Sequence, residues 1–174
     1  MKTNTMQDRR TATLVDLLNE LAAGQRDLLA VIEAKIVAMR QGNPEAIREA
    51  TLREQAVVVR MTERESLRRQ LAVNIARGYG VGADAARRMS AAQLADRIGG
   101  SEGGRIRRAA EELKTLTRQV TSRNHVAELI AQNVLRHVKI AFESITGGVR
   151  EALGYSPIGH TYAGGRERIL DAVG

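Results

Sequence analysis

Apolar residues recur three or four positions apart over most of the chain, and this spacing predicts α-helices. Between Thr11 and about Gln41 the apolar positions, interrupted at Gln25, are Leu14, Leu18, Leu21, Leu28, Ile32, Ile36 and Met39. In a second stretch, from Pro44 to about Arg77, they are Ile47, Ala50, Val57, Met61, Leu71 and Ile75. Two long amphipathic helices, 11–41 and 44–77, are therefore expected in the first half of the chain.

A short polar break separates these two helices. Gly42 can close the first helix, Asn43 can cap the second, and Pro44 suits the first helical position. Because the break is so short, we expect an antiparallel helical hairpin. The seam of the second helix also contains polar side chains, at Glu54, Arg64 and Arg68. Such a face is either partly solvated or reserved for a partner that supplies matching charges.

The second half of the chain predicts a short helix followed by a very long one. The helical spacing stops in a glycine-rich connector that begins at Gly78. A capping-box pattern, Ser90-Ala91-Ala92-Gln93, then predicts a short helix over 90–98. A long helix over about 104–147 follows, with apolar positions at Ile106, Ala109, Leu113, Leu116, Val120, Ala127, Ile130, Val134, Ala141 and Ile145.

The predicted fold is all-α, with a long antiparallel helical hairpin, a short helix and a long C-terminal helix that form an elongated bundle or coiled coil. We expect one elongated domain over residues 1–153. A flexible tail is expected over 154–174, where glycine and proline accumulate. The long last helix cannot bury its apolar stripe against itself, so it requires the hairpin, a second copy of the chain or another protein.

The composition narrows the classes of partner. Hydrophobic residues make up 43% of the chain but aromatic residues only 2%, which suits thin seams between helices better than a thick core. The formal net charge of +7 raises the question of nucleic acid. Basic residues are interspersed with acidic ones, however, as in Glu63-Arg64-Glu65, and no basic cluster exceeds a pair. Nucleic-acid binding is therefore the less favoured alternative.

The sequence predicts neither an enzyme nor a metal or cofactor site. His125, His137 and His160 are twelve or more residues apart, and no Ser, His and Asp grouping indicates nucleophilic catalysis. The chain has no cysteine and no amino-terminal secretory signal, which favours the cytoplasm. No run approaches the roughly 18 apolar residues of a membrane span, so we expect no stable membrane insertion.

The order of these elements resembles that of the FlgN family of flagellar export chaperones. The clearest local similarity is the segment from Arg123 to Leu135, RNHVAELIAQNVL, which is similar to the family's pattern of "RN" followed by apolar residues and a further Asn or Ser. Near the C-terminus, Thr161-Tyr162-Ala163-Gly164-Gly165 is similar to the family's "TYGPDG" but lacks its proline and aspartate.

This resemblance implies a chaperone that binds the terminal helices of the hook-filament junction proteins FlgK and FlgL. It would prevent their premature assembly and deliver them to the export gate of the flagellar type III apparatus. The implied client-binding residues are Val120, Ala127, Ile130, Val134, Ala141 and Ile145. Asn124 and Asn133 are either polar residues that set the register of a client or ordinary exposed positions. Tyr162 either helps to dock the chaperone on the gate or is a solvated tail residue.

Three other interpretations stay open at this point. The stripes could bury one another in a purely structural helical bundle or coiled-coil homo-oligomer that has no client. The chain could be a chaperone for another flagellar client, such as flagellin or the filament cap. Nucleic-acid binding is the third.

Overall fold

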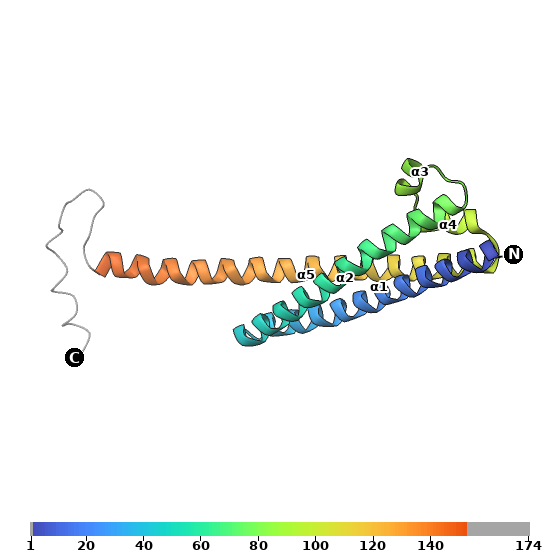
Figure 1. Ribbon diagram of the computed structural model, residues 1–174. Coiled ribbons are helices and arrows are strands. Elements are labelled where there is room, and N and C mark those ends of the chain that lie inside the picture. Colours follow the sequence, from blue (N-terminus) through green and yellow to red (C-terminus); the bar gives the residue numbers. More distant parts are fainter. Residues whose placement is uncertain (1, 153–174) are drawn as a thin grey trace, which may run out of the picture. The chain divides into compact units, whose positions relative to one another are not determined.

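The computed structural model describes residues 2–152, and the side chains of residues 6–146. Over this range it contains five helices and no strand: α1 (Lys2–Arg40), α2 (Pro44–Gly78), α3 (Ala83–Arg88), α4 (Ala91–Ile98) and α5 (Gly100–Ala152) (Figure 1). The predicted all-α fold is confirmed. The predicted tail over 154–174 lies outside the described residues.

The chain divides at Ile130 into two units. The first unit, Met1–Ile130, contains helices α1 to α4 and the part of α5 up to Ile130. The second unit begins at Ala131, and its described residues belong to α5. That residues 1–153 act as a single domain stays a prediction.

Helices α1 and α2 form the expected hairpin. The side chain of Asn43 accepts a hydrogen bond from the amide of Ala46 at 3.1 Å, Pro44 begins α2, and Gly42 has a φ of 62°. These three observations confirm the predicted break. Ion pairs join Lys35 to Glu54 and Glu20 to Arg64, so positions late in α1 lie beside positions early in α2. The two helices are therefore antiparallel.

The polar seam positions of α2 are matched by charges of the chain itself. Lys35 of α1 pairs with Glu54, and both side chains are at most one fifth exposed. Arg64 Nε lies 3.1 Å from Glu20 Oε2 of α1. Arg68 hydrogen-bonds Glu65, one turn earlier in α2. Each of these three charged side chains therefore has a partner of opposite charge within the hairpin.

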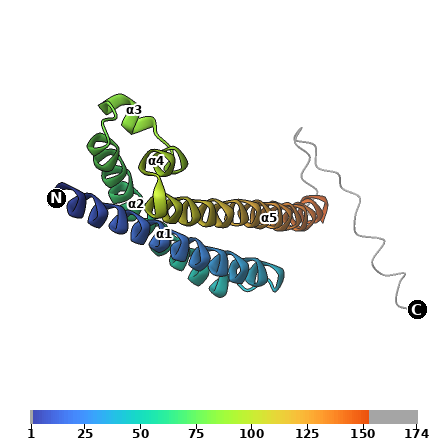
Figure 2. The same ribbon diagram turned by 90° about the vertical axis from the view of Figure 1, so that its right-hand side faces the viewer.

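Within the first unit, α5 packs against α1 and runs parallel to it. Arg26 pairs with Glu112, and further along both helices Arg123 Nε lies 2.6 Å from Glu33 Oε1. The contacts therefore advance in the same direction along both helices. The result is a three-helix bundle of α1, α2 and the first part of α5, with α3 and α4 at the end where α1 begins (Figure 2).

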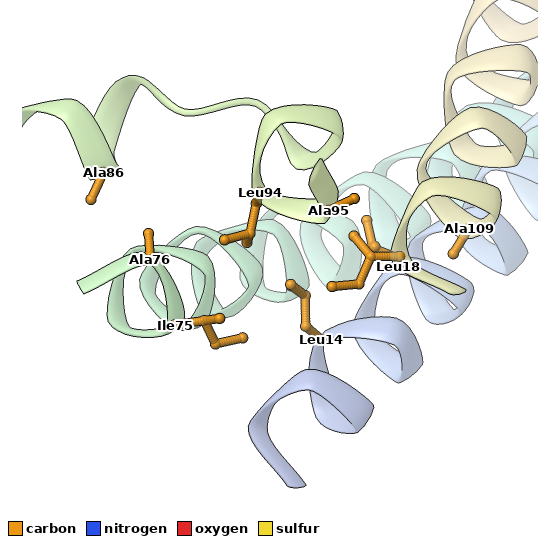
Figure 3. Packing of buried hydrophobic residues seen from close by; sticks show 9 residues of the cluster. Leu14, Leu18, Ile75, Ala76, Ala86, Leu94, Ala95 and Ala109 are labelled. Atoms are coloured by element: carbon orange, nitrogen blue, oxygen red, sulfur yellow. The ribbon is translucent and has the colours of Figure 1, made fainter. Parts of the chain in front are cut away.

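The described side chains form two core clusters in this bundle. The first cluster contains Leu14, Leu18, Ile75, Ala76, Ala86, Leu94, Ala95, Ile106 and Ala109 (Figure 3). The second contains Leu28, Ile32, Ile36, Val57, Val120 and Ala127. Gln25, the gap in the apolar stripe of α1, stands between the α1 residues of the two clusters. Its Oε1 atom is buried and has no hydrogen-bond partner among the described residues. The polar interruption at Gln25 in the apolar stripe of α1 therefore lies between the two core clusters.

Three helix bounds differ from the sequence prediction. Helix α1 begins at Lys2 rather than near Thr11, because residues 2–10 contain no helix breaker although they lack an apolar stripe. Helix α3 falls in the predicted connector region. Its six residues are too few to show a helical periodicity in the sequence. One of them, Ala86, is buried in the first cluster. Helix α5 begins at Gly100 and continues through Gly147 to Ala152, so it exceeds the predicted 104–147 at both ends.

The early start of α5 has a packing reason. The turn from α4 uses Gly99 and Gly100, with φ values of 71° and 56° that favour glycine. Gly103 then lies so close to α4 that an added Cβ would overlap the carbonyl oxygen of Ala95. Gly103 therefore permits α5 to pack closely on α4, and it does not end the helix. The short helix itself begins as predicted, because Ser90 and Gln93 form both hydrogen bonds of a capping box.

Candidate functional site

The residues predicted to bind a client fall into two groups on α5. Val120 and Ala127 are buried in the second core cluster, at 6% and 4% exposure. Ile130 is partly buried and packs against the same cluster. These three side chains therefore already have neighbours within the chain.

The remaining predicted residues are exposed. Val134 and Ile145 are 44% and 68% exposed, and Ala141 is also open to solvent. Asn124 and Asn133 are exposed. Because successive residues of a helix are about 100° apart, Asn133 borders the face of Val134 and does not lie on it. Tyr162 lies outside the described residues.

Three further apolar residues of α5 belong to this surface and were missed as client-binding positions. Leu135, Val138 and Phe142 are 69%, 60% and 66% exposed. With Ile145 they recur at steps of three and four, so they occupy one face of the helix. The sequence contains this second run as regularly as the first, but spacing alone does not show which run is exposed. We call Val134, Leu135, Val138, Ala141, Phe142 and Ile145 the α5 stripe.

The chemistry of the α5 stripe is that of a helix-binding surface. It is aliphatic apart from one aromatic ring, and it extends over about three turns. Charged side chains lie beside it, including Lys139 and Glu143, which pair at 3.8 Å and are largely exposed. Apolar anchors repeated at each turn with charges on the flanks are the pattern by which one amphipathic helix binds another.

The exposed apolar residues of α2 are arranged differently. Val58 and Val59 are adjacent, at 45% and 59% exposure, while Leu52 and Leu67, at 58% and 46%, lie six and eight residues away from this pair. These positions are separated by about two turns and do not repeat at steps of three and four, so they do not make a continuous apolar surface.

A cleft in the first unit is a second candidate surface. It has a volume of about 470 Å³ and lies between α1, α2 and α5. Gln25, whose side-chain oxygen is buried and has no hydrogen-bond partner among the described residues, lines it together with Glu65 and Arg69. A donor group from a ligand would satisfy that oxygen. Most of the cleft wall is apolar, but Gln25, Glu65 and Arg69 interrupt it, whereas the residues of the α5 stripe are all apolar.

Comparison with known protein families decides the class to which this helical protein belongs. The family model described as FlgN protein matches residues 6–163, which is most of the chain. The chain belongs to the FlgN family. The family predicted from the sequence is thus confirmed. No curated protein and no solved structure matches the chain.

FlgN-family proteins are export chaperones of the bacterial flagellum, and the family is one of chaperones rather than of enzymes. This role agrees with a site that is an apolar helix face and not a cluster of reactive groups. Within residues 2–152 there is no group of three or more His, Cys, Asp or Glu side chains that could hold a metal ion. No helix in that range is long and apolar enough to span a membrane.

Proposed function

We propose that this FlgN-family protein is the export chaperone of hook-filament junction proteins of the FlgK and FlgL type. It binds their terminal helices, prevents their premature assembly and delivers them to the export gate of the flagellar type III apparatus in the cytoplasm. Family membership supports the chaperone role. The observation that supports the binding mode is the α5 stripe, on which Leu135, Val138 and Phe142 each expose well over half of their surface.

The energetics of such a surface suit a complex that must later be released. Burial of an aliphatic side chain contributes roughly 1.5–3 kcal/mol. Association costs about 4–15 kcal/mol in lost freedom of motion, before side chains are ordered. The five larger side chains of the stripe together contribute an amount of the same order as this cost. Such a balance suits a reversible complex, which protects a client helix and releases it at the gate.

The remaining predicted residues take different parts in this proposal. Asn133 borders the α5 stripe, and Asn124 lies ten residues before its first residue, in the first unit. Both are proposed to set the register of the client helix. Ile130 lies where the buried and exposed parts of the α5 pattern meet. Val120 and Ala127 reach a client only when α5 separates from the hairpin, because both are buried against the second cluster. Tyr162 is proposed to dock the loaded chaperone on the gate.

Co-expression tests this function. The full chain is produced with the C-terminal segment of FlgK or FlgL from the same organism and analysed by size-exclusion chromatography with light scattering. We expect a stable complex that Val138→Asp or Phe142→Asp weakens at least tenfold, because each places a charge in the apolar interface. The matched control is Ser144→Asp, which adds the same charge about 200° around the helix from Phe142.

Two outcomes would contradict the proposal. A complex that survives both Val138→Asp and Phe142→Asp would show that the client binds elsewhere. A chain that binds neither segment and elutes as a compact oligomer dissociated by the same substitutions would show that the α5 stripe pairs with a second copy. The purely structural bundle would then be the better description.

A further inference from the structure

A second cleft in the first unit lies between α2 and α3 and is rich in arginine. Its volume is about 560 Å³. Arg68 and Arg69 of α2 and Arg87 of α3 line it, together with the amide side chains of Gln70 and Asn74. Val73 and Met89 add an apolar part to the wall. The cleft therefore combines cations, hydrogen-bonding groups and an apolar surface.

The cleft lies in the most basic part of the chain. Residues 60–108 contain eleven arginines and five acidic residues, so this stretch carries six of the seven net positive charges. The basic residues of this stretch occur singly or in pairs. In the linear sequence they are therefore spread out and form no basic cluster. The fold gathers those from Arg68 onward at one end of the first unit, because the end of α2, α3, α4 and the start of α5 meet in the first core cluster.

The arginines of the cleft are only partly neutralised. Arg68 Nε and Arg69 Nε each lie 2.7 Å from a carboxylate oxygen of Glu65. The hydrogen bond from Arg68 lowers the pKa of Glu65, so this carboxyl is an anion at neutral pH. One negative charge is thus shared by two guanidinium groups. Arg87 is exposed and forms no ion pair within the described part of the chain. The three arginines together retain a surplus of about two positive charges.

We propose that this cleft binds an acidic peptide segment of a partner protein. Carboxylates of the segment would pair with the guanidinium groups, whose planar fork matches a carboxylate. An apolar side chain of the same segment would pack on Val73 and Met89. A peptide fits better than single-stranded nucleic acid, which is commonly bound by stacking on aromatic rings. Of the described side chains that line the cleft, none is aromatic.

This binding site is independent of the proposed client surface. The cleft belongs to the first unit, whereas the α5 stripe lies in the second. An Arg87 variant should therefore bind FlgK or FlgL segments as the unchanged protein does. The two proposals can consequently fail separately.

The test uses the full chain and a fluorescent peptide that alternates acidic residues with leucine. Fluorescence anisotropy should show binding that weakens as salt is added, and no binding to the same peptide with lysine at the acidic positions. Arg87→Glu should weaken the affinity about tenfold, because it reverses the unpaired charge of the cleft. Arg87 is exposed, and its substitution does not alter the neighbouring Ala86, which is buried in the core. Helix content measured by circular dichroism should therefore not change.

The control is Arg118→Glu, which makes the same change in net charge outside the cleft. Arg118 is exposed on α5 and forms no ion pair among the described residues. Its variant should bind the peptide like the unchanged protein. Equal weakening by both substitutions would overturn the proposal in favour of diffuse charge attraction. Unchanged binding by Arg87→Glu would also overturn it. So would a single-stranded oligonucleotide of equal charge that binds more tightly than the peptide and is weakened by Arg87→Glu.

Discussion

Apolar residues recur at three-four spacing along helix α5, but they are buried in the first unit and exposed to solvent in the second. In the first unit Ile106 and Val120 are 0% and 6% exposed, because α1, α2 and α4 cover them. In the second unit Val138 and Phe142 continue the three-four spacing but are 60% and 66% exposed. Spacing therefore specifies which face of a helix is apolar. It does not specify whether the partner of that face belongs to the same chain.

The largest expected difference between the two parts of α5 concerns stability. Ile106→Ala should lower the free energy of unfolding by about 2–5 kcal/mol, because it opens a cavity in the first cluster. Val138→Ala should change it by less than about 0.5 kcal/mol, since an exposed side chain loses few contacts. Urea denaturation followed by circular dichroism measures both. A similar loss of unfolding free energy in both variants would mean that the α5 stripe is buried in solution. The two parts of α5 would then not differ in exposure.

A smaller effect is expected where the buried part of α5 begins. Gly103→Ala should cost about 1–3 kcal/mol, because its methyl group would overlap the carbonyl oxygen of Ala95. Gly104→Ala is the matched control. Nothing lies within 4 Å of a Cβ at that position, and alanine is favoured over glycine in a helix by about 1 kcal/mol. Thermal unfolding should therefore show a lower midpoint for the first variant and a higher one for the second. Stabilisation by both would show that α4 does not pack closely on α5.

Much of the fold could be predicted because its signals are local. The break at Gly42-Asn43-Pro44 and the capping box at Ser90 each depend on a few neighbouring residues, and the structure contains both. Helix α3 could not be predicted, because six residues are too few for a periodicity. The start of α5 was missed because Gly103 is a packing residue, and its close neighbour in α4 is not visible in a linear pattern.

The candidate site could be predicted only in outline. The sequence places an apolar face on the last helix, but it does not distinguish the buried Val120 and Ala127 from the exposed Leu135 and Phe142. That distinction depends on which neighbours α1 and α2 supply. The seam charges of α2 give the same lesson, since Glu54 proved to be matched by Lys35 of the adjacent helix. In both cases the periodicity of the sequence did not specify the neighbours of a side chain, which depend on tertiary contacts.

In the proposed function, the exposed part of the α5 pattern receives the client helix. Hydrogen exchange of the full chain, measured with and without the C-terminal segment of FlgK or FlgL, locates the residues that the segment covers. We expect the segment to slow exchange in residues 131–146 and to leave the hairpin nearly unchanged. Protection confined to residues that line the cleft beside Gln25, with no change in 131–146, would contradict the proposal.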